Sequence, residues 1–426
     1  MNESLFQSIW QFSLYRPQQL FTTDGEAVTI INPGKRNTNA GPDFFEAKVR
    51  IGNVILVGNI ELHIHPGEWT RHSHHKNPAY QNIILHVVYY NSTIAAIPEN
   101  VPMLVMEPHI PSYIIKQYTE LVQTNLTLPC ANALQNVNEL VREAWINRLL
   151  AERWEQKLLE WKQLLTKSAG DWRTLLYWRI AANFGFKINA DPFLMLAQYT
   201  PINVLAKHRE NLMQTEAILF GQAGFLESET SDDYFEMLRK EYCYLRQKYQ
   251  LQAMPNHLWK FLRLRPANFP TVRIAQFAAL IHRSVHLFSQ IVAATDIPLL
   301  HELFSVQASE YWDHHYRFGE HHEKKKIKHL GTSSVENLII NTIAPIQFLY
   351  ASEQGQEELK ENALQLLESI TPEKNHLTEL WQQHGWQIKN AMHSQALLQL
   401  YNGYCSSKRC LECSIGLNII RSRPDK

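Results

Sequence analysis

The sequence predicts an α+β protein: an N-terminal mixed β-sheet domain with flanking helices over residues 1–132, followed by a large all-α region over residues 133–426. Three observations give this fold class. Short β-type runs separated by Gly, Asn and Pro fill the stretch from Gly25 to Met106. From Asn138 onward, apolar residues instead recur at three- and four-residue steps. The length of 426 residues exceeds one compact core and suits two or three domains.

The N-terminal elements follow one another in a simple order. An amphipathic segment from Leu5 to Leu14 precedes the β-type runs, which read AVTIINP, DFFEAKVRIG, NVILVGNIELHIH, NIILHVVYYN and PMLVM. Gly52-Asn53 separates the second run from the third and suits the turn of a hairpin. The segment PSYIIKQYTELVQTN then reads as a helix. We therefore expect a sheet with a helix before it and another after it.

The rest of the chain has the pattern of successive amphipathic helices. The first helical segment begins near Asn138 and carries charged residues between its apolar ones for nearly thirty residues. Further helical patterns occupy residues 171–184, 202–220, 231–250, 272–292, 334–350 and 355–370. The stretch 313–329, DHHYRFGEHHEKKKIKH, is strongly polar and predicts an exposed loop.

Composition and charge exclude several classes of protein. The 41 basic residues balance the 41 acidic ones, so the whole chain lacks the basic field that drives bulk nucleic-acid binding, although a local basic patch is compatible with this balance. No apolar run is long enough for a membrane span, and the N-terminus lacks the pattern of an export signal. Five cysteines in this length do not form a disulfide framework. We expect a cytoplasmic protein without membrane association.

An acidic pair with nearby histidines is the most informative motif. In the strand that ends at His65, the residues Glu61, His63 and His65 alternate with apolar ones and share one face. Asp43 opens the preceding strand, so the hairpin should bring it close to Glu61 and His63. Two carboxylates suit a hard divalent cation such as Mg²⁺ or Mn²⁺. A structural alternative also fits, in which Asp43 caps a turn and Glu61 pairs with Arg50 or Lys48.

This motif resembles the PD-(D/E)XK nuclease superfamily, whose core is a helix, three strands, a helix and a strand. Pro42-Asp43 and Glu61-Leu62-His63 match its Pro-Asp and Glu-x-Lys, with His63 where the family has lysine. The resemblance implies a metal-dependent phosphodiesterase or nuclease that acts on nucleic acid. Asp43 and Glu61 would bind the metal and His63 would orient or deprotonate water, with His65 and His75 as further candidate ligands.

A second resemblance competes with the nuclease interpretation. His63-x-His65-x-x-Glu68, with His86 one strand later, is similar to the metal motif of cupin β-barrels. It implies a metalloenzyme acting on a small molecule and requires a closed barrel around these histidines. The spacing to Glu68 is one residue shorter than in that motif, and its second part is missing.

A second candidate metal site lies at the C-terminal end, where Cys405-x4-Cys410-x2-Cys413 is the one tight cysteine cluster. Thiolates at this spacing suit Zn²⁺ or an iron–sulfur cluster. A fourth ligand would come from Cys130, Cys243 or a histidine such as His393. Some PD-(D/E)XK nucleases carry an iron–sulfur cluster on one early and three late cysteines, which Cys130 and the terminal three resemble. The structural alternative is three reduced thiols without a metal, on a loop flanked by Lys and Arg.

Longer phrases along the chain are identified as those of a bacterial family, the domain-of-unknown-function family numbered 2851. They include NAGPDF, GNIELH, ILFGQAGFL and RPANFPTVRIAQFA. The family implies no reaction. The hypothesis is therefore a metal-dependent, nuclease-like hydrolase. Its main alternative is a non-catalytic scaffold with structural metal sites, whose helical region binds a protein partner.

Overall fold

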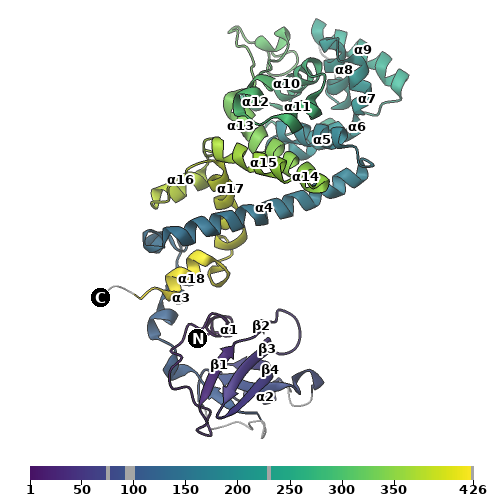
Figure 1. Cartoon of the computed structure of the whole chain (residues 1–426). Helices are drawn as coiled ribbons and strands as arrows, with labels where there is room; N and C mark the ends of the chain where they lie inside the picture. Colours follow the sequence, from purple (N-terminus) through teal and green to yellow (C-terminus); the bar gives the residue numbers. More distant parts are fainter. Residues whose placement is uncertain (73–76, 92–100, 228–231, 424–426) are drawn as a thin grey trace. The chain divides into compact units, whose positions relative to one another are not determined.

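The computed structural model describes residues 1–72, 77–91, 101–227 and 232–423, and it is a mixed α+β structure (Figure 1). The chain divides into two compact units. The first comprises residues 1–147, 380–386 and 399–426, and the second comprises residues 148–379 and 387–398. The predicted fold class is confirmed at this level. The C-terminal cysteines, which the sequence placed with the helical region, belong to the compact unit of the N-terminal sheet.

The first unit is built around a six-stranded sheet of order β1-β3-β4-β5-β6, with β2 paired to β3. Its elements from the N-terminal part of the chain are α1 (Glu3–Gln11), β1 (Val28–Asn32), β2 (Lys35–Arg36), β3 (Phe44–Ile51), β4 (Val54–His63), α2 (Glu68–Arg71), η2 (Pro78–Tyr80), β5 (Ile83–Val88), β6 (Met103–Val105), η3 (Glu107–His109), α3 (Ser112–Gln123) and η4 (Ala131–Asn136). Figure 1 shows β1, β3 and β4 as neighbouring arrows. Along the chain, the helix α1 is followed by the main strands β1, β3 and β4, then by the four-residue helix α2 and the strands β5 and β6.

Strand pairing explains the position of the acidic residues. β1, β3 and β4 pair in antiparallel fashion, and Ile51 opposite Val54 closes the hairpin at the expected Gly52-Asn53 turn. β5 then pairs with β4 in parallel, with His86 opposite Glu61. A parallel neighbour requires a crossover connection, which the segment containing α2 and η2 supplies.

Local sequence features fix the elements that surround these strands. The Asn2 side chain accepts a hydrogen bond from the Leu5 backbone N–H at 2.9 Å and begins α1. The register of β3 against β4 shifts between Phe44 and Ala47, and Glu46 has a φ of 56° at this bulge. Gly58 has to be glycine, because a Cβ there would lie 2.8 Å from the Asn82 carbonyl oxygen.

The second unit is helical, and α8 and α10 are buried along most of their length, as expected for central helices. Its described elements are α4 (Glu139–Lys167), which begins in the first unit, α5 (Trp172–Phe184), α6 (Ala190–Tyr199), α7 (Ile202–His208), α8 (Leu212–Gln222), α9 (Asp233–Tyr249), η5 (Asn256–Leu258), η6 (Pro266–Asn268), α10 (Pro270–Arg283), α11 (Leu287–Ala293), α12 (Ile297–Leu303), η7 (Glu310–Asp313), α13 (Thr332–Leu338), η8 (Ile339–Ile343), α14 (Ala344–Gln354) and α15 (Glu357–Ser369).

The last elements of the chain return to the first unit. They are α16 (His376–Gln383), α17 (Ala391–Leu400), η9 (Tyr401–Cys405), η10 (Cys410–Glu412) and α18 (Ser414–Arg421), and α16 and α17 each contribute residues to both units. In the described part of the chain, no helix combines the length and the apolar character that crossing a membrane requires.

Candidate functional site

Asp43 and Glu61 form an interlocked pair at the start of β3 and near the end of β4. The Asp43 backbone N–H donates to Glu61 Oε2 at 3.0 Å, and the Leu62 backbone N–H donates to Asp43 Oδ2 at 3.0 Å. Glu61 is only 5% exposed, whereas Asp43 is half-buried. The hairpin thus brings the two residues into contact, as the sequence predicted.

Gln7 of α1 binds the second oxygen of the Asp43 carboxylate, the one that does not accept the Leu62 N–H. Gln7 Nε2 donates to Asp43 Oδ1 at 2.8 Å, and Arg36 Nη2 on β2 donates to Gln7 Oε1 at 2.8 Å. Because both Asp43 oxygens accept hydrogen bonds, the carboxylate has a fixed orientation. Sequence reasoning did not include Gln7, since nothing in the amphipathic pattern of this helix distinguishes it from other polar residues.

Burial and mutual repulsion determine the electrostatics of the pair. Burial raises the pKa of the Glu61 carboxyl well above its usual range, and the neighbouring Asp43 charge raises it further. Burial also raises the pKa of Asp43, while the hydrogen bond from Leu62 N–H acts in the opposite direction. Such a pair is relieved by a shared proton or by a cation.

The donor set fits a hard divalent cation. Carboxylate oxygens are what Mg²⁺ and Mn²⁺ prefer, and Mg²⁺ is commonly held by one or two carboxylates together with water and substrate oxygens. Across the described ranges of the chain, no group of three or more His, Cys, Asp and Glu side chains is arranged to hold a metal ion. A cation held at this position would therefore have Asp43 and Glu61 as its carboxylate ligands.

His63 and His86 complete the polar cluster from adjacent parallel strands. Nδ1 of His63 lies 2.9 Å from Nε2 of His86, and Nε2 of His63 lies 3.6 Å from Glu61 Oε1. Both rings are buried, and the Trp69 ring of α2 lies 5.0 Å from the His86 ring between centroids. One ring nitrogen of His63 is thereby oriented by His86, while the other faces the Glu61 carboxyl group. Asp43, Glu61 and His63 are brought together as predicted, and His86 joins them.

The remaining predicted residues of this region have other positions. His65 is exposed beyond the end of β4, and its ring stacks on Tyr90 at 5.2 Å. His75 lies outside the described residues. Glu68 accepts hydrogen bonds from the Ile64 and His65 backbone N–H groups and pairs with Arg71 at 3.1 Å, which is a turn-capping role.

The strand pairing bears on two alternative interpretations: an ion pair of Glu61 with Lys48 or Arg50, and a cupin-like barrel. Lys48 stands opposite Val57 and Arg50 opposite Ile55, so neither basic residue is the cross-strand neighbour of Glu61. The cupin alternative needs a closed barrel: among the described strands no ladder joins β1 to β6 directly, and the isolated bridges Phe21–Ala27 and Thr22–Leu104 link these two edges through the segment before β1.

The C-terminal cysteines also converge. Cys405, Cys410 and Cys413 line one small cavity together with Cys130, and all four are buried. Burial raises the pKa of the Cys130 thiol to about 12 and that of Cys410 to about 11, with the neighbouring thiols contributing. The fifth cysteine, Cys243, is exposed on α9.

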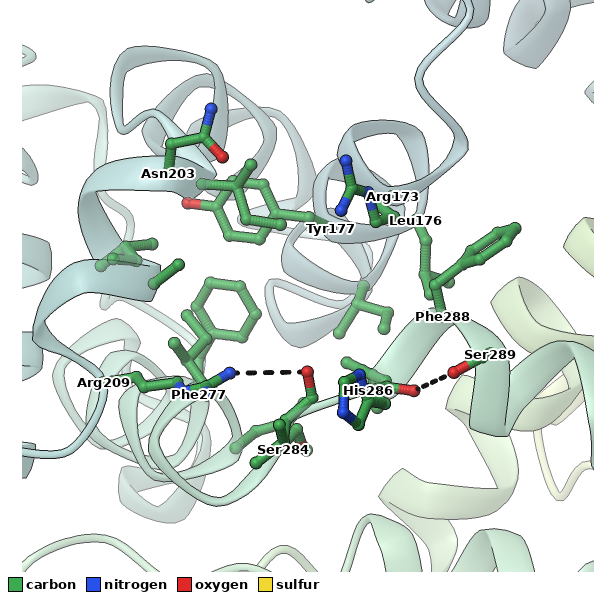
Figure 2. Close-up of a pocket in the computed structure, with 18 of the residues that line it drawn as sticks. Arg173, Leu176, Tyr177, Asn203, Arg209, Phe277, Ser284, His286, Phe288 and Ser289 are labelled. Atoms are coloured by element: carbon green, nitrogen blue, oxygen red, sulfur yellow. Dashed lines mark hydrogen bonds between the residues drawn. The ribbon is translucent and has the colours of Figure 1, made fainter.

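The helical unit contains a separate cavity of about 410 Å³ between α5, α7, α10 and α11 (Figure 2). Tyr177 and Phe277 contribute aromatic surface to it, and the side chains of Arg173 and Arg209 also line it. Arg209 Nη1 donates to the Val285 carbonyl at 3.5 Å. The lining combines apolar, polar and charged side chains, and Asp171 in it pairs with Arg173 at 3.5 Å. No sequence pattern had indicated this cavity.

Comparison with known proteins places the chain in a family without giving it a reaction. No curated protein and no solved structure matched the chain. Residues 3–376 match the model of the family described as "Protein of unknown function (DUF2851)". Because this match covers most of the chain, the protein belongs to the DUF2851 family, as its sequence phrases indicated.

Proposed function

We propose that this protein is a metal-dependent phosphodiesterase of the nuclease type, with Asp43 and Glu61 as metal ligands and His63 as the residue that activates water. The interlocked Asp43–Glu61 pair carries the proposal. Each residue's carboxylate accepts a hydrogen bond from the backbone at or next to the other residue, at 3.0 Å in both cases. This arrangement fixes a half-buried and a buried carboxyl group side by side, and ionisation of both is costly unless a cation or a shared proton offsets the charge.

The chemistry follows from the arrangement of the side chains. A divalent cation bound by the two carboxylates would polarise a phosphodiester and lower the pKa of water. His63 Nε2, which lies 3.6 Å from Glu61 Oε1, is in place to accept the proton of an attacking water. His86 supports the other nitrogen of that ring, and Gln7 keeps the Asp43 carboxylate in position.

Nucleic acid is the favoured substrate class because strands β2 and β3 of the same sheet carry basic side chains. Lys35 is exposed on β2, Lys48 and Arg50 are exposed on β3, and half-buried Arg36 on β2 is linked to Asp43 through Gln7. Phosphate backbones are bound by such cationic side chains. The net charge of the whole chain is zero, so the proposed attraction is local.

The first test is metal binding. Calorimetric titration with Mn²⁺ should show one site in the wild type that Asp43→Asn and Glu61→Gln each abolish. Glu46→Gln is the matched control, because Glu46 is an exposed carboxylate on β3 that pairs with Lys35 at 2.7 Å. It should bind Mn²⁺ like the wild type.

The second test is cleavage of end-labelled single-stranded DNA, duplex DNA and RNA with Mg²⁺ or Mn²⁺. Activity should require the metal and disappear in the two site variants while the control keeps it. Equal Mn²⁺ binding by Glu61→Gln and the wild type would overturn the assignment of ligands. Metal binding without cleavage of any nucleic acid would overturn the assignment of substrate.

A further inference from the structure

We propose that Cys130, Cys405, Cys410 and Cys413 bind one soft-metal centre, either a zinc ion or an iron–sulfur cluster, that fastens the C-terminal segment to the N-terminal unit. Four of the five cysteines of the chain line a single cavity of about 20 Å³, together with Pro129, Tyr404, Arg409 and Gly416. Each of the four is at most 8% exposed. Four thiolates are the donor set that Zn²⁺ and iron–sulfur clusters share.

The backbone around the three late cysteines is irregular in a way that turns their side chains to one cavity. Cys405 ends the π-helical turn η9, Cys410 begins the 3-10 turn η10, and Cys413 is the N-cap residue of α18. Between the first two, Lys408 has a left-handed φ of 53°. The chain therefore changes direction twice within nine residues, and each change places a thiol at the same cavity.

Gly416 permits this close packing. A Cβ at this position would lie 2.2 Å from the Cys410 carbonyl oxygen, so the first turn of α18 can approach η10 only because the residue is glycine. The glycine also lines the cavity.

Hydrogen bonds bring this segment to Cys130, which is remote in sequence. Lys408 Nζ donates to the Val122 and Thr124 carbonyls, both at 2.7 Å, where α3 ends. Gln117 Nε2 of α3 donates to the Ser422 carbonyl at 2.9 Å, just past the end of α18. α3 leads directly to Cys130, so these contacts bring the two cysteine-bearing segments together within one unit.

Burial alone does not account for the arrangement. A reduced cysteine packs as a small apolar residue, which explains why each one is buried. It does not explain why two distant segments deliver four thiols to one cavity. Among the described residues, the four thiols share the cavity without the close spacing of metal ligands. Zinc binding would therefore require rotation of the four side chains, and the larger iron–sulfur core would also require the walls of the small cavity to move apart.

Metal content of the full-length, untagged protein purified without oxygen tests the proposal. Elemental analysis should find one zinc per chain, or iron accompanied by acid-labile sulfide and absorbance near 400 nm. Cys130→Ser and Cys410→Ser should each lose most of this metal. Cys243→Ser is the matched control, since this cysteine is exposed and remote from the cavity, and it should keep the full amount.

Thiol titration provides a measurement that does not depend on folding of the variants. In the native wild type, dithionitrobenzoate should modify one thiol rapidly, that of Cys243, and the other four only after chelation of the metal. Five equally slow or equally fast thiols would overturn the proposal. So would a wild type that takes up neither zinc nor an iron–sulfur cluster on reconstitution, or a Cys130→Ser variant that retains the full metal content.

Discussion

Glu216 allows a quantitative test of the electrostatics of the helical unit. This carboxyl on α8 is completely buried and accepts hydrogen bonds from the Ser309 hydroxyl at 2.8 Å and from the Tyr234 hydroxyl. Burial raises its pKa from 4.5 to about 7. A carboxyl with a raised pKa favours the folded state at low pH, and this stabilisation is lost as the pH rises from the unfolded pKa to the folded one. Neutralising Glu216 should therefore matter most at alkaline pH.

The magnitude of the effect follows from the shift. Ionised Glu216 costs about 3 kcal/mol above pH 7, because each pKa unit corresponds to about 1.4 kcal/mol. Glu216→Gln removes this cost but weakens one hydrogen bond, which is worth about 1 kcal/mol. We expect the variant to be more stable than the wild type by about 2 kcal/mol at pH 8 and less stable by about 1 kcal/mol at pH 4.5.

Urea unfolding followed by tryptophan fluorescence at several pH values measures the difference. Trp312 is a fully buried reporter in the same unit. His315 and His321 line a cavity with Glu216, but they are common to both proteins, so their contributions to the difference largely cancel. The exposed Glu210 provides the control variant Glu210→Gln, which should show no such crossover. A difference that stays constant from pH 4.5 to 8 would refute the reasoning.

Three further predictions concern the two candidate sites. His63→Ala should lower phosphodiesterase activity by about 10²–10⁴-fold, whereas His63→Lys should retain part of it, as measured by the cleavage rate at saturating Mn²⁺; equal rates for both variants would contradict a role in water activation. Gln7→Ala should weaken Mn²⁺ binding about tenfold in calorimetry without abolishing it, because it removes a group that orients the Asp43 carboxylate. Gly416→Ala should lower the melting temperature and speed the loss of metal to a chelator, because the added methyl group collides with the Cys410 carbonyl; unchanged release kinetics would argue against a tightly packed metal centre.

Much of the sheet and of the acidic pair could be predicted because the signals are local. The amphipathic segment from Leu5 to Leu14 contains most of α1, and Gly52-Asn53 forms the expected turn. Alternation along β4 and the position of Asp43 at the start of the preceding strand were enough to place the two carboxylates together. A hairpin is determined by nearby residues, so its register can be read from sequence.

Contacts between distant segments were harder to predict. Cys130 was one of several candidates for the fourth thiol, because no local pattern indicates that α18 packs against α3. The predicted exposed loop 313–329 is partly wrong for the same reason. Its first residue, Asp313, and its Lys328 are both buried, and Lys328 Nζ donates to the Lys326 carbonyl at 2.8 Å. Charge counting cannot reveal that backbone carbonyls satisfy a buried ammonium group.

The two candidate sites are connected through α1 of the first unit. The Arg421 guanidinium at the end of α18 lies 5.3 Å from the centre of the Phe12 ring, which immediately follows α1. Helix α1 also presents Gln7 to the Asp43 carboxylate. The C-terminal segment therefore contacts the end of the helix that carries Gln7, and a fragment ending at residue 132 would lose this contact. Cleavage and metal binding should therefore be measured on the full chain. There, loss of metal from the cysteine centre and loss of metal from the acidic site can be distinguished, because each site has its own variants.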